Sequence, residues 1–143
     1  REALADGTID VVGTDHAPHP VEDKDCEWAA GAFGMTGLET ALPIIIATMV
    51  EPGRMTWRDV ARVLSTTPAL IGRAEDQGQG LEAGAPANLC LVDPAVKRVV
   101  DPAAQWTRSS NSPYAGMELP GQVMATFLHG RPTVLDGKPV EAA

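Results

Sequence analysis

The N-terminal part of the chain alternates between short apolar runs and polar interruptions. Residues 9 to 14, Ile-Asp-Val-Val-Gly-Thr, are rich in β-branched side chains and end near a glycine, which predicts a short strand. Residues 15 to 20 are polar and contain two prolines, so neither a strand nor a helix can continue through them. Residues 21 to 33 are acidic at first and then small, which predicts an exposed loop. Side chains capable of chemistry therefore follow the carboxyl end of a strand.

Three helices are predicted in the next segment. Apolar residues fill nearly every position from 37 to 50, which predicts a largely buried helix that a Pro-Gly pair ends. Thr56, with an aspartate three residues later, has the spacing of a capping box and opens a second helix over residues 56 to 64. A threonine followed by Pro68 predicts an N-cap and the first position of a third helix, which runs to about residue 73.

The pattern changes to short strands after residue 80. Residues 87 to 92 alternate as a strand does, and residues 122 to 128 and 132 to 135 predict two strands joined by a turn at His129 and Gly130. Residues 101 to 120 are rich in Ser, Asn, Pro and Gly, which predicts a long loop.

This change of pattern predicts a boundary near residues 80 to 84. We therefore divide the chain into residues 1–82, which are mainly helical after the first strand, and residues 83–143, which form a small β layer. The chain does not begin with methionine, and we expect it to be part of a longer protein.

Composition narrows the class of protein. A length of 143 residues, with 44% hydrophobic and 21% charged residues, is typical of a soluble globular domain. The net charge of -8 and the scattered basic residues argue against a nucleic-acid partner. The longest apolar run, residues 41 to 50, is shorter than the roughly 20 residues of a membrane span, so no membrane partner is expected. Two cysteines, Cys26 and Cys90, form no disulfide framework or zinc-binding spacing and favour a cytoplasmic location.

Reactive side chains are densest in Asp15-His16-Ala17-Pro18-His19, directly after the predicted strand. In a (β/α)8 barrel, groups at the carboxyl ends of the strands face a shared active site. An aspartate in that place can ligate a cation and can also carry a proton, and metal-assisted hydrolysis needs both abilities. The segment therefore favours a hydrolytic site.

The same segment resembles the eighth-strand signature of class I dihydroorotases, which are members of the amidohydrolase superfamily. The resemblance includes Ala-Phe-Gly-Met-Thr-Gly-Leu-Glu-Thr at residues 32 to 40 and continues through residues 85 to 93 and 111 to 116. It implies an α/β fold: the closing part of a (β/α)8 TIM barrel, with strand 8 and the following helices, plus C-terminal strands of a flanking β-sandwich. It also implies reversible hydrolysis of the cyclic amide of L-dihydroorotate to N-carbamoyl-L-aspartate in de novo pyrimidine (UMP) biosynthesis.

The resemblance assigns roles to four residues. Asp15 matches a metal-ligating catalytic aspartate that acts as general base on a bridging hydroxide and then as acid toward the leaving nitrogen. His19 matches a histidine that helps to bind the substrate carboxylate. Phe33 and Gly34 match a loop whose backbone groups hydrogen-bond the pyrimidine ring. Ala32 stands where the family often has proline, which bears on the stiffness of this loop.

The implied cofactor is a zinc pair, whose other ligands precede this segment in the family. A catalytic zinc takes about three protein ligands, so we expect the chain by itself to be inactive. The implied partners are dihydroorotate, N-carbamoyl-aspartate, the rest of the same chain, a second copy in a homodimer and aspartate transcarbamoylase. Two alternatives stay open: a hydantoinase, dihydropyrimidinase or allantoinase, against which His19 argues, and a non-catalytic dihydroorotase-like scaffold of aspartate transcarbamoylase.

Each assigned residue also has a structural alternative. Asp15 could be a turn residue, His19 could hold a loop, and Phe33 could fill the core. For His16 we expect an orienting role rather than ligation, and for residues 111 to 116 a structural turn rather than catalysis. We expect the three tryptophans to be packing residues: Trp28, Trp57 and Trp106.

Overall fold

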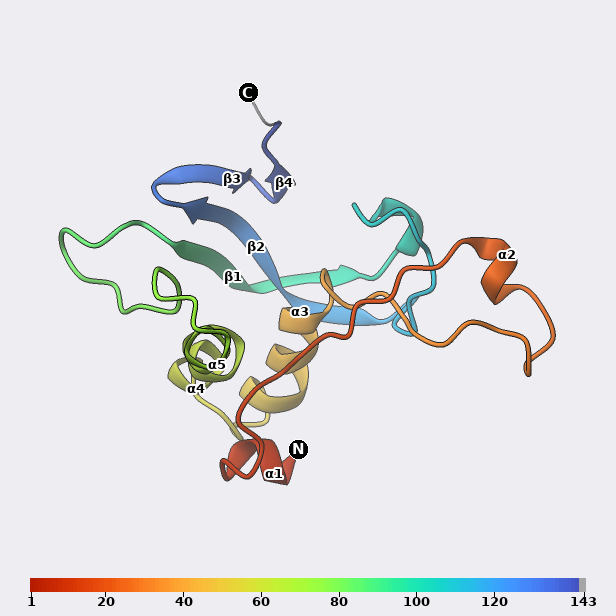
Figure 1. The fold of residues 1–143 in the computed structure, drawn as a ribbon, viewed down its shortest axis with the longest axis horizontal. Coiled ribbons are helices and arrows are strands. Elements are labelled where there is room, and N and C mark those ends of the chain that lie inside the picture. Colours follow the sequence, from red (N-terminus) through yellow and green to blue (C-terminus); the bar gives the residue numbers. More distant parts are fainter. Residues whose placement is uncertain (142–143) are drawn as a thin grey trace.

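The computed structural model describes residues 1–141 as a four-stranded antiparallel sheet with helices on one side of it (Figure 1). The strands follow one another in the order β1-β2-β3-β4. Their bounds are β1 Leu89–Val99, β2 Glu118–Leu128, β3 Arg131–Leu135 and β4 Lys138–Pro139. The helical elements are α1 Glu2–Ala5, α2 Val21–Lys24, α3 Ala41–Ile45, η1 Ile46–Val50, α4 Trp57–Ala61, η2 Arg62–Thr66, α5 Thr67–Gly72 and η3 Pro102–Ala104.

The predicted strand at residues 9 to 14 is wrong for this chain. Figure 1 draws the segment without a strand arrow. The nearest pairing among the described residues is an isolated parallel bridge that joins His16 to Met35. A strand exists through hydrogen bonds to a neighbouring strand. Here the Val12 N–H instead donates to the Val63 carbonyl at 3.1 Å, so a helix takes the place of a strand partner.

The first long helix is confirmed over most of its length. It consists of α3 and η1 and carries buried residues, as predicted, and it gives way to a turn at Glu51. It begins at Ala41 rather than at Gly37, because the Gly37 carbonyl accepts the Thr40 and Ala41 N–H groups in a preceding turn. The Gly37 N–H donates to a histidine ring rather than to a helical partner.

The capping box at the start of α4 is confirmed. The Thr56 hydroxyl accepts the Asp59 N–H at 3.3 Å, and the Asp59 carboxylate accepts the Thr56 N–H at 2.9 Å. The predicted break before Pro68 is wrong, because α4, η2 and α5 follow one another without interruption. The π-helical turn η2 ends at Thr66, two residues before the proline, and such a widened turn accommodates a residue that lacks an N–H and clashes with the preceding turn.

The strands of the C-terminal part are confirmed and extend beyond their predicted bounds. β1 continues past Pro94, where its register against β2 shifts between Asp93 and Lys97. The predicted turn is present, with positive φ at His129 (49°) and Gly130 (77°), as a tight hairpin between twisted strands requires. A second turn, at Asp136 and Gly137, leads to β4. The sequence pattern did not predict this last strand.

The buried core lies between the helices, and a second contact joins them to the sheet. The core cluster consists of Leu4, Ile45, Met49, Met55, Val60 and Val63. Ile46 is turned toward β2, where a Cβ on Gly121 would lie 2.3 Å from its Cδ1 atom. The division at residues 82 and 83 stays a prediction, and residues 142 and 143 of its second part lie outside the described residues.

Two surface features complete the description. No helix in residues 1–141 has the length and apolar character needed to cross a membrane. The prediction that the tryptophans pack is wrong: Trp28 is 99% exposed, Trp106 66% and Trp57 43%. Trp28 and Trp106 lie in loops, and neither side chain is buried.

Candidate active site loops

The segment that begins at Asp15 is held against residues 35 to 37. The Ala17 N–H donates to the Met35 carbonyl at 2.9 Å. The His16 ring accepts the Gly37 N–H at its Nδ1 atom, at 3.0 Å. Because a neutral imidazole with an accepting Nδ1 carries its proton on Nε2, this contact fixes the ring orientation. His16 thus makes a structural hydrogen bond between the two segments, and its orienting role in an active site stays a prediction.

Gly34 allows these two segments to approach closely. Its φ is +114°, and a Cβ at this position would lie 2.4 Å from the Ala17 Cβ. Residues other than glycine rarely adopt such a backbone conformation. In any other residue the steric overlap with Ala17 would add to this backbone strain. The glycine is therefore required for the contact between the loop of residues 15 to 20 and the loop of residues 32 to 37.

His19 joins the same two loops through its side chain. Its Nε2 atom lies 2.8 Å from the Phe33 carbonyl oxygen and so donates a proton to it. Its Nδ1 atom lies 3.9 Å from an Asp23 carboxylate oxygen. Its backbone N–H donates to the Ser109 hydroxyl at 3.2 Å, which brings a third segment to the site. The structural alternative, a loop hydrogen bond, is therefore what this histidine makes here.

Asp15 lies at the start of the loop with an exposed side chain. Its φ is +44°, a left-handed conformation that aspartate tolerates better than most residues. Its carboxylate makes no hydrogen bond or ion pair with the described residues. An exposed carboxylate without partners retains its full capacity to ligate a cation or to exchange a proton with solvent.

The four predicted site residues do not all touch one another. His19, Phe33 and Gly34 are joined directly, since a Cβ on Gly34 would also lie 3.6 Å from the His19 Nε2 atom. Asp15 belongs to the same loop but has no described contact with these three. The alternative that Phe33 fills the core is wrong, because its side chain is 97% exposed.

Two residues that the sequence analysis assigned to no site hold these loops together. The Lys24 ammonium donates to the Ala32 carbonyl at 2.7 Å and to the Gly34 carbonyl at 3.0 Å. The Asn111 amide donates to the Ala17 carbonyl at 3.1 Å and to the Gly34 carbonyl at 3.2 Å. The sequence around Lys24, a single lysine in an acidic loop, contains no pattern that indicates a functional role. Asn111 lies in a motif that was predicted to be a structural turn, and its side chain joins segments far apart in the sequence.

A metal site is not complete in the described part of the chain. No three His, Cys, Asp or Glu side chains within residues 1–141 are grouped as metal ligands. A catalytic zinc needs about three protein ligands. Asp15 can supply one of them, and the other ligands would have to come from elsewhere.

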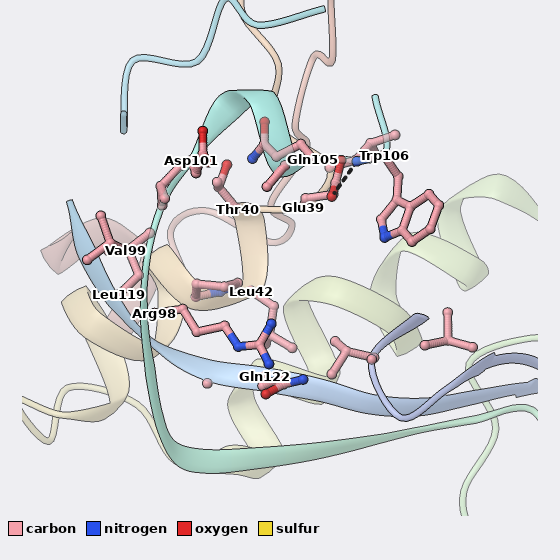
Figure 2. A pocket seen from close by; sticks show the side chains of 18 of the residues that line it. Glu39, Thr40, Leu42, Arg98, Val99, Asp101, Gln105, Trp106, Leu119 and Gln122 are labelled. Carbon is pink, nitrogen blue, oxygen red and sulfur yellow. Dashed lines mark hydrogen bonds between the residues drawn. The ribbon is translucent and has the colours of Figure 1, made fainter. Parts of the chain in front are cut away.

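One cavity of the described chain lies away from these loops. A cavity of about 430 Å³ is enclosed by the start of α3, one face of the sheet and the loop of residues 101 to 106. Figure 2 shows the Arg98 guanidinium and the Gln122 amide pointing toward one another in it. The Glu39 carboxylate at its rim accepts the backbone N–H groups of Trp106 and Thr107, each at 3.0 Å. None of the four predicted site residues lines this cavity, so it is not the candidate site.

Comparison with known proteins places this arrangement in a family. No model of a protein family matches the chain. A dihydroorotase of Streptomyces coelicolor is 59% identical over 138 residues, which are 96% of this chain and 32% of that protein. A dihydroorotase of Mycobacterium tuberculosis is 53% identical over 138 residues, with the same coverage. The chain thus spans about a third of the length of the curated relatives that it matches.

Solved structures give the same result for the fold. An L-hydantoinase (dihydropyrimidinase) from Arthrobacter aurescens aligns with a TM-score of 0.88 and 32% identity, over 98% of this chain and 32% of that one. A D-hydantoinase (dihydropyrimidinase) from Thermus sp. aligns with a TM-score of 0.87 and 28% identity, over 99% of this chain and 31% of that one. The mixed α/β chain, with its sheet, its helices and the loops that carry Asp15 and His19, is a member of the dihydroorotase-like amidohydrolases and corresponds to the C-terminal third of such a protein.

Proposed function

We propose that this chain forms the closing part of a class I dihydroorotase, which hydrolyses the cyclic amide of L-dihydroorotate reversibly in de novo pyrimidine biosynthesis. In this proposal residues 9 to 14, which have no strand partner within residues 1–141, pair as strand 8 of a (β/α)8 barrel only when the rest of the protein supplies the neighbouring strands, and the sheet of the C-terminal part belongs to a flanking β-sandwich. The observation that carries the proposal is the loop in which Asp15 keeps an exposed carboxylate, without a partner among residues 1–141, while His19, Phe33 and Gly34 are held together a few residues away.

Asp15 is the proposed metal ligand and proton carrier. Its carboxylate fits one position of a zinc site, whose remaining ligands come from outside this chain, and a bound zinc pair would supply water that is acidic near neutral pH. Asp15 would accept the proton of that water and deliver it to the leaving amide nitrogen. Its exposed carboxylate, unpaired in the described chain, suits this exchange, because no hydrogen bond has to break first.

The backbone at Phe33 and Gly34 is the proposed binding site for the substrate ring. The Phe33 carbonyl is occupied by His19, whereas the N–H groups of Phe33 and Gly34 make no hydrogen bond with the described residues. His19 is proposed to face the substrate carboxylate. Its Nε2 proton is donated to the Phe33 carbonyl, so binding of a carboxylate would require either the other ring nitrogen or a shift of this bond.

A second candidate function is hydrolysis of a hydantoin or a dihydropyrimidine. It is favoured by the alignment with L-hydantoinase and D-hydantoinase structures over nearly the whole chain. The higher identity to dihydroorotases, 59% against 28% to 32%, supports dihydroorotate as the first substrate to test. Substrate carboxylate recognition separates the two functions, because only the dihydroorotate ring carries that group.

The cellular setting belongs to the same proposal. The chain would act in the cytoplasm, within a homodimer, with dihydroorotate and N-carbamoyl-aspartate as its small-molecule partners. Association with aspartate transcarbamoylase, as a catalytic or as a scaffolding subunit, is a further proposed partnership. An intact Asp15 supports the catalytic form, since a scaffold has no use for a metal ligand.

A chimeric enzyme tests the proposal. The matching segment of the Streptomyces coelicolor dihydroorotase is replaced by this chain, and zinc content and turnover of dihydroorotate, dihydrouracil and hydantoin are measured. We expect zinc-dependent turnover of dihydroorotate by the chimera and none by the 143-residue chain alone. A folded, zinc-loaded chimera that prefers hydantoin or dihydrouracil would replace dihydroorotase by the second candidate, and one that turns over none of the three would refute both.

The Asp15→Asn variant of the same chimera tests the proton carrier. Asn keeps the size of Asp and an oxygen for the metal but cannot accept a proton, so turnover should fall by at least the roughly 10²- to 10⁴-fold attributed to general acid–base catalysis. Circular dichroism and metal analysis on the same preparation serve as controls. A folded, metal-loaded variant that keeps more than about a tenth of the activity would show that another group carries the proton.

A further inference from the structure

Three consecutive carbonyl groups of the loop at residues 32 to 34 are held by side chains from other segments. The Ala32 carbonyl accepts from Lys24 at 2.7 Å, and the Phe33 carbonyl accepts from His19 at 2.8 Å. The Gly34 carbonyl accepts from both Lys24 at 3.0 Å and Asn111 at 3.2 Å. A loop of this length would otherwise leave its carbonyl groups to water.

The direction of these carbonyls fixes the direction of the adjoining N–H groups. In a planar trans peptide the C=O and N–H bonds point in opposite directions. The Ala32 carbonyl faces Lys24, so the Phe33 N–H points away from Lys24. The Phe33 carbonyl faces His19, so the Gly34 N–H points away from His19. Neither N–H makes a hydrogen bond with the described part of the chain, and two adjacent donors are thus available to an acceptor on a ligand.

Asn111 connects this loop to the rest of the site. Both protons of its amide are used, on the Ala17 and Gly34 carbonyls, and its backbone carbonyl accepts the Thr36 N–H at 3.2 Å. Its side-chain oxygen contacts the hydroxyl of Ser109, which is 7% exposed and accepts the His19 N–H. One asparagine therefore joins three segments that lie up to 94 residues apart.

We propose that Lys24 and Asn111 are positioning residues for the loop of residues 32 to 34. Lys24 holds the peptide group that carries the Phe33 N–H, and Asn111 holds the Gly34 carbonyl that follows, so that the Phe33 N–H and the Gly34 N–H, whose peptide group His19 holds, are presented to the substrate's cyclic amide. The inference rests on the proposed function for the identity of that substrate, whereas the orientation itself belongs to this chain. Lys24 makes two bonds with one charge, and charged donors form stronger hydrogen bonds than neutral ones. The lysine is therefore the main determinant, and the asparagine couples it to the loop of residues 15 to 20.

Nuclear magnetic resonance of the 143-residue chain tests the orientation directly. The chain has two phenylalanines, so labelling with ¹⁵N-phenylalanine gives one amide signal from Phe33 and one from Phe127 in β2 as an internal reference. Lys24→Met keeps the length of the side chain and removes the donors, and it should shift the Phe33 signal while leaving Phe127 in place. Lys24→Arg should restore the original position, and Lys97→Met, an exposed lysine on β1, should move neither signal.

Steady-state kinetics of the chimera test the consequence for binding. Lys24→Met and Asn111→Ala should each raise the KM for dihydroorotate about tenfold or more, with a smaller change in kcat. A loss of this size is expected when a hydrogen bond to a charged or firmly held group is removed. Asn88→Ala is the matched control, because the Asn88 amide also bridges two segments, from the Asp76 carbonyl to the His129 N–H, but away from these loops. Its KM should stay within about twofold of the parent chimera.

The two measurements fail separately. A Phe33 signal that Lys24→Met leaves in place overturns the orienting role, and so does a KM that rises equally in Asn88→Ala. Lack of turnover in the unsubstituted chimera overturns the proposed function and the substrate part of the inference. A shifted Phe33 signal with rescue by Lys24→Arg would still support the orienting role in that case.

Discussion

Replacing Gly34 by alanine should damage the candidate site more than any other glycine substitution in its two loops. The backbone at Gly34 has φ +114°, and the new Cβ would lie 2.4 Å from the Ala17 Cβ. Carbon atoms in contact prefer a separation of about 3.5 to 4.0 Å. The two loops would therefore have to separate by more than about an ångström, which their hydrogen bonds oppose.

The cost has two parts that a control separates. Strain from a positive φ costs of order 1 to 3 kcal/mol for a residue other than glycine. Separation of the loops would break the bonds from Ala17 to Met35 and from Asn111 to the Ala17 and Gly34 carbonyls, each with a net value of about 0.5 to 1.5 kcal/mol. We therefore expect Gly34→Ala to lower the free energy of unfolding by about 2.5 to 7.5 kcal/mol in total.

Urea unfolding followed by circular dichroism measures this loss. Gly53→Ala is the control, because Gly53 also has a positive φ, +70°, but a Cβ there would meet nothing within 4 Å. That variant should show the strain alone, about 1 kcal/mol. Equal losses in the two variants would refute the close approach of the loops as the reason for the glycine. In the chimera, Gly34→Ala should also raise the KM for dihydroorotate, whereas Gly53→Ala should not.

Three further outcomes are expected. In the chimera, His19→Ala should lower the efficiency with dihydroorotate more than with uncharged dihydrouracil at unchanged zinc content, and equal losses would indicate a purely structural histidine. Hydrogen bonds from the Thr56 side chain and backbone lower the pKa of Asp59 below its ordinary 3.8. The stabilisation that the Asp59 carboxylate gives should therefore be complete above that pH and should fade as acid protonates the carboxylate. A difference in urea midpoint between the parent chain and Asp59→Asn that persists in strong acid would contradict this. Met49→Ala, at a side chain that is 1% exposed, should lower the free energy of unfolding in urea by about 2 to 5 kcal/mol. Met117→Ala, at a side chain that is 46% exposed, should lower it by less than about 0.5 kcal/mol. Similar losses in the two variants would contradict the packing of η1 in the core.

Local patterns of the sequence were sufficient for part of the fold. Thr56 and Asp59 form their capping box because both partners lie within one helical turn. His129 and Gly130 form the turn between two strands because their side chains permit a positive φ. The motif that begins at Asp15 likewise led to the dihydroorotases, since the residue types and their spacing are visible without coordinates.

Elements that depend on distant partners needed the tertiary structure. Residues 9 to 14 have the composition of a strand, yet within the described chain they pair with a helix carbonyl at Val63. Pro68 has the signal of a helix start, yet the π-helical turn before it lets one helix continue. In both cases the local preference is weak, and the packing around the segment decides its conformation.

The candidate site shows the same division. Residue types alone indicate which side chains could carry chemistry, Asp15 and His19, because the chemical capacity of a side chain is a property of its type. The tertiary structure decided which groups serve those residues: Lys24 reaches across its loop, and Asn111 reaches across 94 residues to the Ala17 carbonyl. Such contacts depend on how loops meet in space, and no short-range pattern in the chain encodes that distance.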